Sequence, residues 1–221
     1  MADNDFLPEP LPGNPLPLLA SWFREARTRA LQPNPDAMVL ATVGSDGAPS
    51  ARVVLCKRLD DAAGYAVFYT NERSRKGREL AHEPRAAAVM HWDALRRQVR
   101  LEGQVLRSPT AESDEYFASR AVLSRLSAWA SQQSEPLESR ATLTSRIEEA
   151  ATRFGVPVDA TDGEVPRPAH WGGYRLWLTS IELWVEAAGR SHDRAVWTRS
   201  LARKDEFSFA ISPWTATRLN P

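Results

Sequence analysis

The chain has 221 residues, of which 43% are hydrophobic and 25% charged, so it can bury one substantial core and does not require a second domain. Lysine and arginine together number 28 and so do aspartate and glutamate, so no overall charge draws the protein to nucleic acid or to an anionic membrane. Because the one cysteine, Cys56, cannot form an internal disulfide and no apolar run approaches the ~20 residues that span a bilayer, we expect a cytoplasmic protein.

The first 17 residues are rich in proline and poor in large apolar side chains. We therefore expect residues 1–17 to form a flexible arm, or a strap over a partner, ahead of a single domain at 18–221. The acidic composition of this arm does not resemble a secretory signal. Between Leu16 and Leu31, apolar residues recur at helical spacing, which predicts an amphipathic helix.

Short β-like runs follow the prolines at positions 33 and 35. Strands are predicted over residues 38–43 and 51–58, joined by a turn at 45–47, and then over 66–70, 86–92 and 98–106. A short helix over residues 74–81 interrupts this series, with Ser74 as its N-terminal cap.

The second half of the chain begins with helices and returns to strands. One helix starts at Thr110 and carries Tyr116 and Phe117, and another covers residues 137–154. Strands are then predicted over residues 174–178, 181–185, 195–199 and 207–211, with a last short strand near Thr217. Six or more meandering strands with inserted helices predict a mainly β (α+β), largely antiparallel fold, closed or partly closed into a barrel.

Common catalytic motifs are missing from the sequence. Neither G-x-G-x-x-G nor G-x-x-x-x-G-K-[ST] occurs, and G-x-S-x-G is absent too. The four histidines and the cysteine lack the spacing of metal ligands, so we expect no metal site.

Cationic side chains instead gather at three places. Arg52 and Lys57 flank an apolar strand, and Arg75 and Lys76 begin a helix, where backbone N–H groups favour a phosphate. The third place, residues 190–194, follows a strand and sets a histidine between two arginines. Taken singly, each is also typical of a solvated strand end, helix start or turn, and composition leaves both interpretations open.

Ten short segments, in this order along the chain, carry a more specific signal. They are Arg52 to Lys57, Phe68 to Asn71, Ser74 to Gly77, Arg97 to Val99, Tyr116 to Arg120, Gln133-Ser134, Pro166 to Arg175, Ile181 to Trp184, Arg190 to Arg194 and Arg218 to Pro221. Together they resemble the pyridoxine 5′-phosphate oxidase family over about residues 16–221. The resemblance implies an FMN-binding split β-barrel that forms a homodimer, with FMN held in grooves between the subunits.

The resemblance also implies roles for individual residues. Those implied to bind FMN, some of them from the opposite subunit, are Arg52, Val53, Val54, Leu55, Cys56, Lys57, Tyr69, Thr70, Arg75, Lys76, Gln98, Gln133, Ser134, Trp184 and Arg194. The substrate phosphate maps to Lys57, Tyr116, Arg120 and Ser124. Arg190 and His192 are the implied catalytic residues, which bind the substrate ring and face its reacting carbon.

The implied activity is that of an FMN-dependent oxidoreductase of vitamin B6 metabolism. C4′ of pyridoxine or pyridoxamine 5′-phosphate gives a hydride to flavin N5, which forms pyridoxal 5′-phosphate. Dioxygen then reoxidises the flavin and is released as hydrogen peroxide. The protein contributes by positioning the substrate against the flavin, so no strongly acidic or nucleophilic side chain is required.

The sequence departs from the family pattern at several places. Residues 1–17 lack the arginine and tyrosine of the family's N-terminal segment, and Ala121 follows Arg120 where proline is usual. Arg125 stands where glutamine is common, and residues 201–213 form a longer stretch than usual. Two alternatives stay open: an FMN oxidase of another ring, such as a dihydrophenazine precursor, and a protein that holds FMN or pyridoxal phosphate without turnover.

Overall fold

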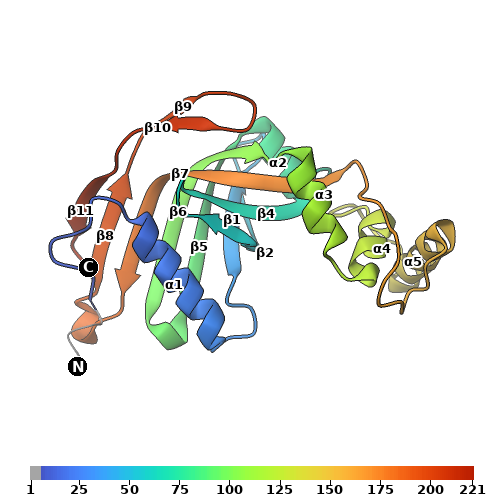
Figure 1. Cartoon of the computed structure of the whole chain (residues 1–221), viewed down its shortest axis with the longest axis horizontal. Helices are drawn as coiled ribbons and strands as arrows, with labels where there is room; N and C mark the ends of the chain where they lie inside the picture. The colour runs from blue at the N-terminus through green and yellow to red at the C-terminus, as the bar shows by residue number, and fades with distance from the viewer. Residues whose placement is uncertain (1–5) are drawn as a thin grey trace.

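A nine-stranded antiparallel sheet curls into a half-barrel in the computed structural model, which describes residues 6–221 (Figure 1). Its strands are β1 (Ala37–Val43), β2 (Pro49–Leu55), β3 (Arg58–Asp60), β4 (Tyr65–Asn71), β5 (Arg85–Trp92), β6 (Arg97–Arg107), β7 (Trp171–Val185), β8 (Asp193–Thr198) and β11 (Thr215–Leu219). The strand order is β11-β8-β7-β6-β5-β1-β2, and β4 joins β3 to β7. This confirms the predicted mainly β, antiparallel fold.

Strand β7 connects the two parts of the sheet. Its first half pairs with β4 and its second half with β8, while β6 pairs with both halves. The sequence predicts two strands here, yet β7 is continuous, and a bulge at Thr179 of β7 shifts the register opposite Glu102 and Gly103 of β6. A Cβ atom at Gly103 would lie 1.8 Å from the carbonyl oxygen of Trp177, so the close approach of the two strands requires glycine.

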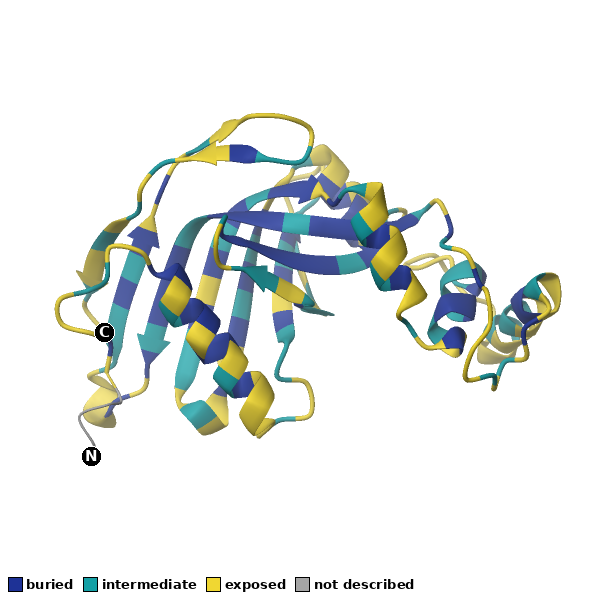
Figure 2. Cartoon of the chain, viewed as in Figure 1, coloured by how far each residue is buried: buried dark blue, intermediate teal, exposed yellow. Residues whose placement is uncertain are grey.

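Five helices pack outside the sheet. They are α1 (Leu16–Arg29), α2 (Arg75–His82), α3 (Thr110–Ala118), α4 (Val122–Ala130) and α5 (Arg140–Phe154). Helix α1 lies against the sheet and buries Leu19, Trp22 and Phe23 in the main core, as its apolar spacing predicts (Figure 2). None of the described helices is long and apolar enough to cross a membrane.

Helices α4 and α5 extend away from the sheet as a helical lobe (Figure 1). They share a small core of their own, in which Val122 and Leu126 of α4 meet Ala150 and Ala151 of α5. The sequence pattern predicts α5 but not α4. With nine residues, α4 is too short to be stable on its own, so it depends on its contact with α5.

The segment ahead of α1 is packed where it is described. Residues 1–5 of the expected arm lie outside the described residues. Beyond them, Leu7 is buried and its N–H donates to Asp193 Oδ2 at 2.8 Å, while Trp197 Nε1 donates to the carbonyl oxygen of Pro12 at 2.7 Å. Leu7 and Pro12 therefore lie against β8 in the structure, and α1 begins at Leu16, inside residues 1–17.

A small hairpin covers the outer end of the sheet. It consists of β9 (Leu201–Arg203) and β10 (Phe209–Ile211), of which the sequence predicts only the second. Phe209 packs on Trp177, with ring centroids 5.7 Å apart. The long stretch between β8 and β11 thus covers aromatic surface of the barrel.

Candidate functional site

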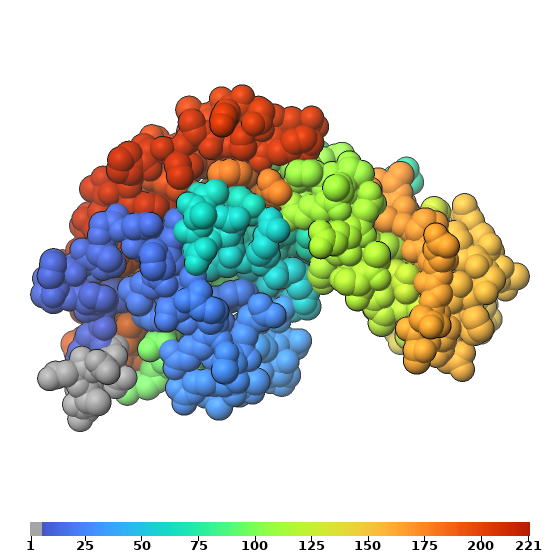
Figure 3. Space-filling model, viewed as in Figure 1, coloured from blue at the N-terminus to red at the C-terminus, as the bar shows by residue number. Residues whose placement is uncertain are grey.

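A cavity of about 430 Å³ opens between the sheet and the helical lobe, where Figure 3 shows the surface hollowed. Its lining residues are Val53, Val54, Leu55, Lys57, Tyr69, Thr70, Asn71, Lys76, Tyr116, Arg120, Ser124, Ser127, Ala128, Ser131, Gln133 and Trp171. A volume of this size suits a small molecule or cofactor. Eleven of the residues predicted to bind FMN or substrate are in this lining, so the structure brings most of the predicted site together.

Three residues predicted to bind FMN, which are Leu55, Cys56 and Lys57, lie at the end of β2 and just after it. Leu55 and Lys57 line the cavity, whereas Cys56 between them is buried and its Sγ lies 3.4 Å from the carbonyl oxygen of Arg58. Burial raises the pKa of the Cys56 thiol to about 12. The side chain of Cys56 therefore lies in the core and outside the cavity lining.

Lys57 is the first cationic group of the cavity. Its Nζ atom lies 2.9 Å from Asp36 Oδ2 at the start of β1. The strand predicted over residues 51–58 is interrupted here, since Lys57 donates its backbone N–H to Val67 of β4. Lys57 is thus held by an acid that the sequence analysis did not identify.

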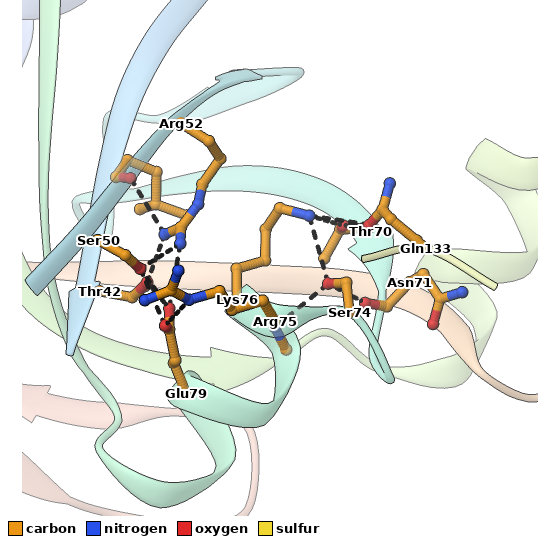
Figure 4. A network of polar contacts seen from close by, with 12 residues as sticks. Thr42, Ser50, Arg52, Thr70, Asn71, Ser74, Arg75, Lys76, Glu79 and Gln133 are labelled. Carbon is orange, nitrogen blue, oxygen red and sulfur yellow. Dashed lines mark hydrogen bonds and ion pairs between the residues drawn. The ribbon is translucent and has the colours of Figure 1, made fainter. Parts of the chain in front are cut away.

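Lys76 is the second cationic group, and it is buried. Its Nζ atom donates to Thr70 Oγ1 at 2.9 Å and to Gln133 Oε1 at 2.8 Å (Figure 4). Ser74 caps α2 by accepting from the N–H of Gly77, as predicted. No carboxylate of residues 6–221 forms an ion pair with Lys76, and burial, together with the charge of Arg52, lowers its pKa to about 8. A buried ammonium held only by neutral oxygens is well suited to an anionic ligand.

Arg52 and Arg75 lie beside the cavity and outside its lining. Arg52 Nη2 is 3.1 Å from Glu79 Oε2, and Arg75 Nε is 2.8 Å from Glu79 Oε1 (Figure 4). The side chain of Arg75 is 60% exposed and that of Arg52 is 20% exposed. Both arginines therefore share one buried carboxylate.

Aromatic rings form one wall of the cavity. Tyr69 and Tyr116 are stacked, with centroids 4.0 Å apart, and Trp171 lies 5.4 Å from Tyr69 in a nearly parallel plane. Burial raises the pKa of Tyr69 to about 12, so its hydroxyl stays protonated at neutral pH. Such a wall suits the face of a planar ring.

Arg120 completes the wall, and its charge has no counter-ion within residues 6–221. Its guanidinium carbon lies 4.9 Å from the ring centroid of Trp171. Its Nη1 atom is buried and has no hydrogen-bond partner among the described residues. Burial lowers the pKa of Arg120, although an arginine stays charged at neutral pH. An unpartnered, buried guanidinium nitrogen beside an open cavity marks a place for an anion.

A second group of predicted residues lies away from the cavity and consists of Gln98, Trp184, Arg190, His192 and Arg194. Gln98 pairs with Trp184 across β6 and β7, and Trp184 pairs with Arg194 across β7 and β8. The rings of Trp184 and His192 are 4.6 Å apart, and Arg190 is exposed in the β7–β8 connection. This connection lies at the end of the sheet opposite the helical lobe (Figure 1). One subunit therefore does not bring Arg190 and His192 to Lys57 and Arg120.

Hydrogen bonding fixes how His192 presents its ring. The backbone N–H of Ala187 donates to His192 Nδ1 at 3.2 Å. Nδ1 is therefore an acceptor, which leaves Nε2 as the protonated nitrogen of the neutral ring. Ser134, also predicted to bind FMN, is exposed with φ of 75° and lies outside the cavity lining.

Sequence reasoning missed several lining residues. Trp171 and Asn71 stand inside the quoted motifs, yet no role was inferred for their side chains. Ser127 and Ser131 follow Ser124 at intervals of three and four residues, a helical spacing that could have revealed both α4 and its cavity face. Asp36 carries no local signal, because its partner Lys57 is distant in sequence, and the only local signal for Glu79 is its i,i+4 spacing from Arg75.

Two family models match the chain. One, described as pyridoxamine 5′-phosphate oxidase, matches residues 25–154, and the other, described as pyridoxine 5′-phosphate oxidase C-terminal dimerisation region, matches residues 171–221. Among curated proteins, a pyridoxine/pyridoxamine 5′-phosphate oxidase of Burkholderia cenocepacia is 48% identical over 90% of this chain and 86% of its own length. One of Burkholderia mallei is 49% identical over 94% of this chain and 89% of its own length.

Solved structures show the same fold. PhzG from Burkholderia lata, in complex with tetrahydrophenazine-1-carboxylic acid, superposes with a TM-score of 0.80, at 30% identity over 95% of this chain and 94% of its own. A pyridoxamine 5′-phosphate oxidase-related, FMN binding protein from Nostoc punctiforme gives a TM-score of 0.66, at 15% identity over 93% and 96% of the two chains. These structures confirm the expected split barrel, and membership of the family confirms FMN as the cofactor.

Proposed function

Since this chain belongs to the pyridoxamine 5′-phosphate oxidase family and is an FMN-dependent oxidoreductase, we propose that it oxidises pyridoxine or pyridoxamine 5′-phosphate to pyridoxal 5′-phosphate, with dioxygen as acceptor and hydrogen peroxide as product. One observation carries the proposal. Arg120 Nη1 is buried and finds no partner in the described part of the chain, and it borders a cavity that Lys57, Tyr116 and Ser124 also line. These are the residues implied to hold the substrate phosphate.

Charge and geometry support a phosphate at this place. A phosphate monoester carries nearly two negative charges and three acceptor oxygens at neutral pH. Arg120 and Lys57 supply cations, and Tyr116 and Ser124 supply hydroxyl donors. A neutral substrate would leave the buried guanidinium of Arg120 uncompensated, which costs several kcal/mol.

The FMN site lies at the other end of the same cavity in this proposal. Lys76, Thr70 and Gln133 are the groups that would bind its phosphate, and Val53 to Leu55 would line the flavin ring. When bound, FMN supplies the hydride acceptor and the site of dioxygen reduction. The chain's own residues bind and orient both molecules and keep water out of the contact between them.

Two subunits complete the site in this proposal. Trp184, Arg190, His192 and Arg194 fall within the segment that matches a dimerisation region, and in one subunit they lie away from the cavity. We infer a homodimer in which this second group covers the partner's cavity. His192 would then present its Nε2–H, and Arg190 its guanidinium, to the substrate ring.

A second candidate function is the oxidation of another ring, such as a dihydrophenazine precursor. The superposition on PhzG favours it, as do Ala121 and the arm that lacks arginine and tyrosine. Identity favours the first candidate, because the vitamin B6 oxidases are 48% and 49% identical while PhzG is 30% identical. Family membership favours either enzyme over a protein that only holds the cofactor.

Oxygen uptake by the FMN-loaded protein tests the proposal. We expect turnover with both phosphorylated vitamers, hydrogen peroxide in equal amount to the oxygen consumed, and little turnover with unphosphorylated pyridoxine. Tetrahydrophenazine-1-carboxylic acid is the competing substrate. Faster turnover of this acid than of either vitamer would replace the first candidate by the second.

A further inference from the structure

Glu79 is the centre of a buried hydrogen-bond network beside the cavity. Its side chain is 7% exposed, and its two oxygens accept from four neighbours (Figure 4). The donors and distances are Thr42 Oγ1 at 2.5 Å, Ser50 Oγ at 2.7 and 2.9 Å, Arg75 Nε at 2.8 Å and Arg52 Nη2 at 3.1 Å. Burial alone would raise the pKa of Glu79, but these hydrogen bonds outweigh it and hold the pKa at about 2.

The network joins residues that are far apart in sequence. Thr42 lies on β1, Ser50 and Arg52 on β2, and Arg75 and Glu79 one turn apart on α2. Arg52 also donates to Thr42 Oγ1 and to Ser50 Oγ, so both of its terminal nitrogens are occupied. The guanidinium of Arg52 is therefore fixed in one orientation, and that of Arg75 is tied to α2.

The charges around Glu79 leave an excess that matches a phosphate. Arg52, Arg75 and Lys76 are cationic, and Glu79 is their one nearby carboxylate among the described residues. Three positive charges and one negative charge leave two positive charges, which equals the charge of a phosphate monoester dianion. Lys76 faces the cavity, and Figure 4 shows it between the Glu79 network and Thr70 with Gln133.

We propose that Glu79 is a positioning residue of the cofactor site, which holds the guanidinium of Arg75 for the FMN phosphate and keeps the charge of Arg52, whose terminal nitrogens are occupied, fixed beside it. Without this carboxylate, two arginines and a lysine would repel one another, and the mostly exposed Arg75 would lose its fixed geometry. A preorganised guanidinium binds an anion more tightly, because less side-chain freedom is lost on binding. The inference rests on the FMN site of the proposed function and not on which ring is oxidised.

Removal of the carboxylate has opposite consequences under two interpretations. If Glu79 is only a counter-charge, Glu79→Gln leaves more positive charge at the site and FMN binds more tightly. If Glu79 positions the arginines, FMN binds less tightly, because the new amide NH₂ group faces guanidinium donors and the network opens. The direction of the change in affinity therefore decides between them.

The experiment measures binding of FMN and of riboflavin to the apoprotein by flavin fluorescence. Riboflavin lacks the phosphate and reports on the ring site alone. We expect Glu79→Gln to raise the Kd of FMN about 10- to 100-fold, the loss of one or two charge-assisted hydrogen bonds, and to leave the Kd of riboflavin unchanged. An unchanged or lower Kd for FMN would overturn the inference, and so would an equal loss of both flavins.

A matched control lies at the end of the same helix. Glu83 pairs with Arg85 and with none of the network residues, and we expect Glu83→Gln to leave both flavin affinities unchanged. If Glu79→Gln fails to fold, Thr42→Val removes one hydroxyl of the network and keeps every charge. This variant is expected to weaken FMN several-fold and riboflavin not at all.

The test separates this inference from the substrate assignment. None of these measurements uses a substrate, so a protein that oxidises a different ring gives the same result. Failure of the unaltered protein to bind FMN more tightly than riboflavin would overturn both the inference and the phosphate site on which it rests.

Discussion

The guanidinium of Arg120 lies over the ring of Trp171, with 4.9 Å between the guanidinium carbon and the ring centroid. A cation–π contact holds a guanidinium in place without occupying its N–H groups. Nη1 is accordingly buried and unpartnered among the described residues. A ligand anion that enters the cavity meets a donor that is already oriented, which is the physical basis of the proposed substrate phosphate site.

Replacement of Arg120 by alanine is expected to impair use of the phosphorylated substrate. Loss of a charge-assisted contact of about 1.5–3 kcal/mol lowers kcat/KM about 10- to 100-fold, while FMN stays bound. Steady-state oxygen uptake and flavin absorbance measure the two effects. The control is Arg153→Ala, which removes an arginine stacked on Trp129 in the helical lobe. Equal activity of the two variants would contradict the assignment of Arg120.

The pKa of Lys76 predicts how FMN affinity depends on pH. Burial lowers this pKa to about 8, so the ammonium of the free protein is charged below this pH and loses its proton above it. FMN affinity is therefore expected to be greatest between about pH 6, where the phosphate becomes a dianion, and about pH 8, and to fall above it. Titration with FMN and riboflavin from pH 6 to 10 measures this. An FMN affinity that stays constant through pH 9.5 would exclude Lys76 as a phosphate ligand.

Arg190→Leu is expected to lower turnover by orders of magnitude while FMN stays bound. Arg190 is exposed and away from the cavity of its own subunit, so its effect would be exerted across the dimer. When Arg190→Leu subunits are mixed and refolded with Arg120→Ala subunits, half of the dimers are mixed and each of these has one intact site. About a quarter of the unaltered activity should then return. Activity no higher than that of the two parent variants would contradict the shared site.

Gly103→Ala is expected to destabilise the barrel itself. The added Cβ would lie 1.8 Å from the carbonyl oxygen of Trp177, so β6 and β7 must separate at the bulge. Overpacking of this kind costs about 1–3 kcal/mol, which lowers the Tm by roughly 2–4 °C per kcal/mol in a chain of this size. Thermal unfolding of the apoprotein measures the shift, and Gly13→Ala, where the added atom contacts nothing, is the control. Equal Tm values for the two variants would show that the strands yield without cost.

Local sequence was enough to predict most elements of secondary structure. The apolar spacing that produces α1 and the cap formed by Ser74 depend on neighbours within a few residues, and both are confirmed. Helix α4 and the continuous course of β7 depend on distant partners, since α4 packs on α5 and β7 pairs with three strands. Periodicity predicts two strands in place of β7, because it carries no information on what a strand pairs with.

The sequence by itself determined which residues bear the chemistry: cations beside apolar strands, hydroxyls near them and a histidine between two arginines. Only the tertiary structure decided their partners, because a charge pairs with whatever the fold brings near it. Lys57 meets Asp36, Arg52 and Arg75 share Glu79, and Arg120 keeps a nitrogen unpaired. The fold also places Arg190 and His192 away from the cavity. They lie in the connection between β7 and β8 at one end of the sheet, whereas the cavity lies at the other end, and strand register decides this separation.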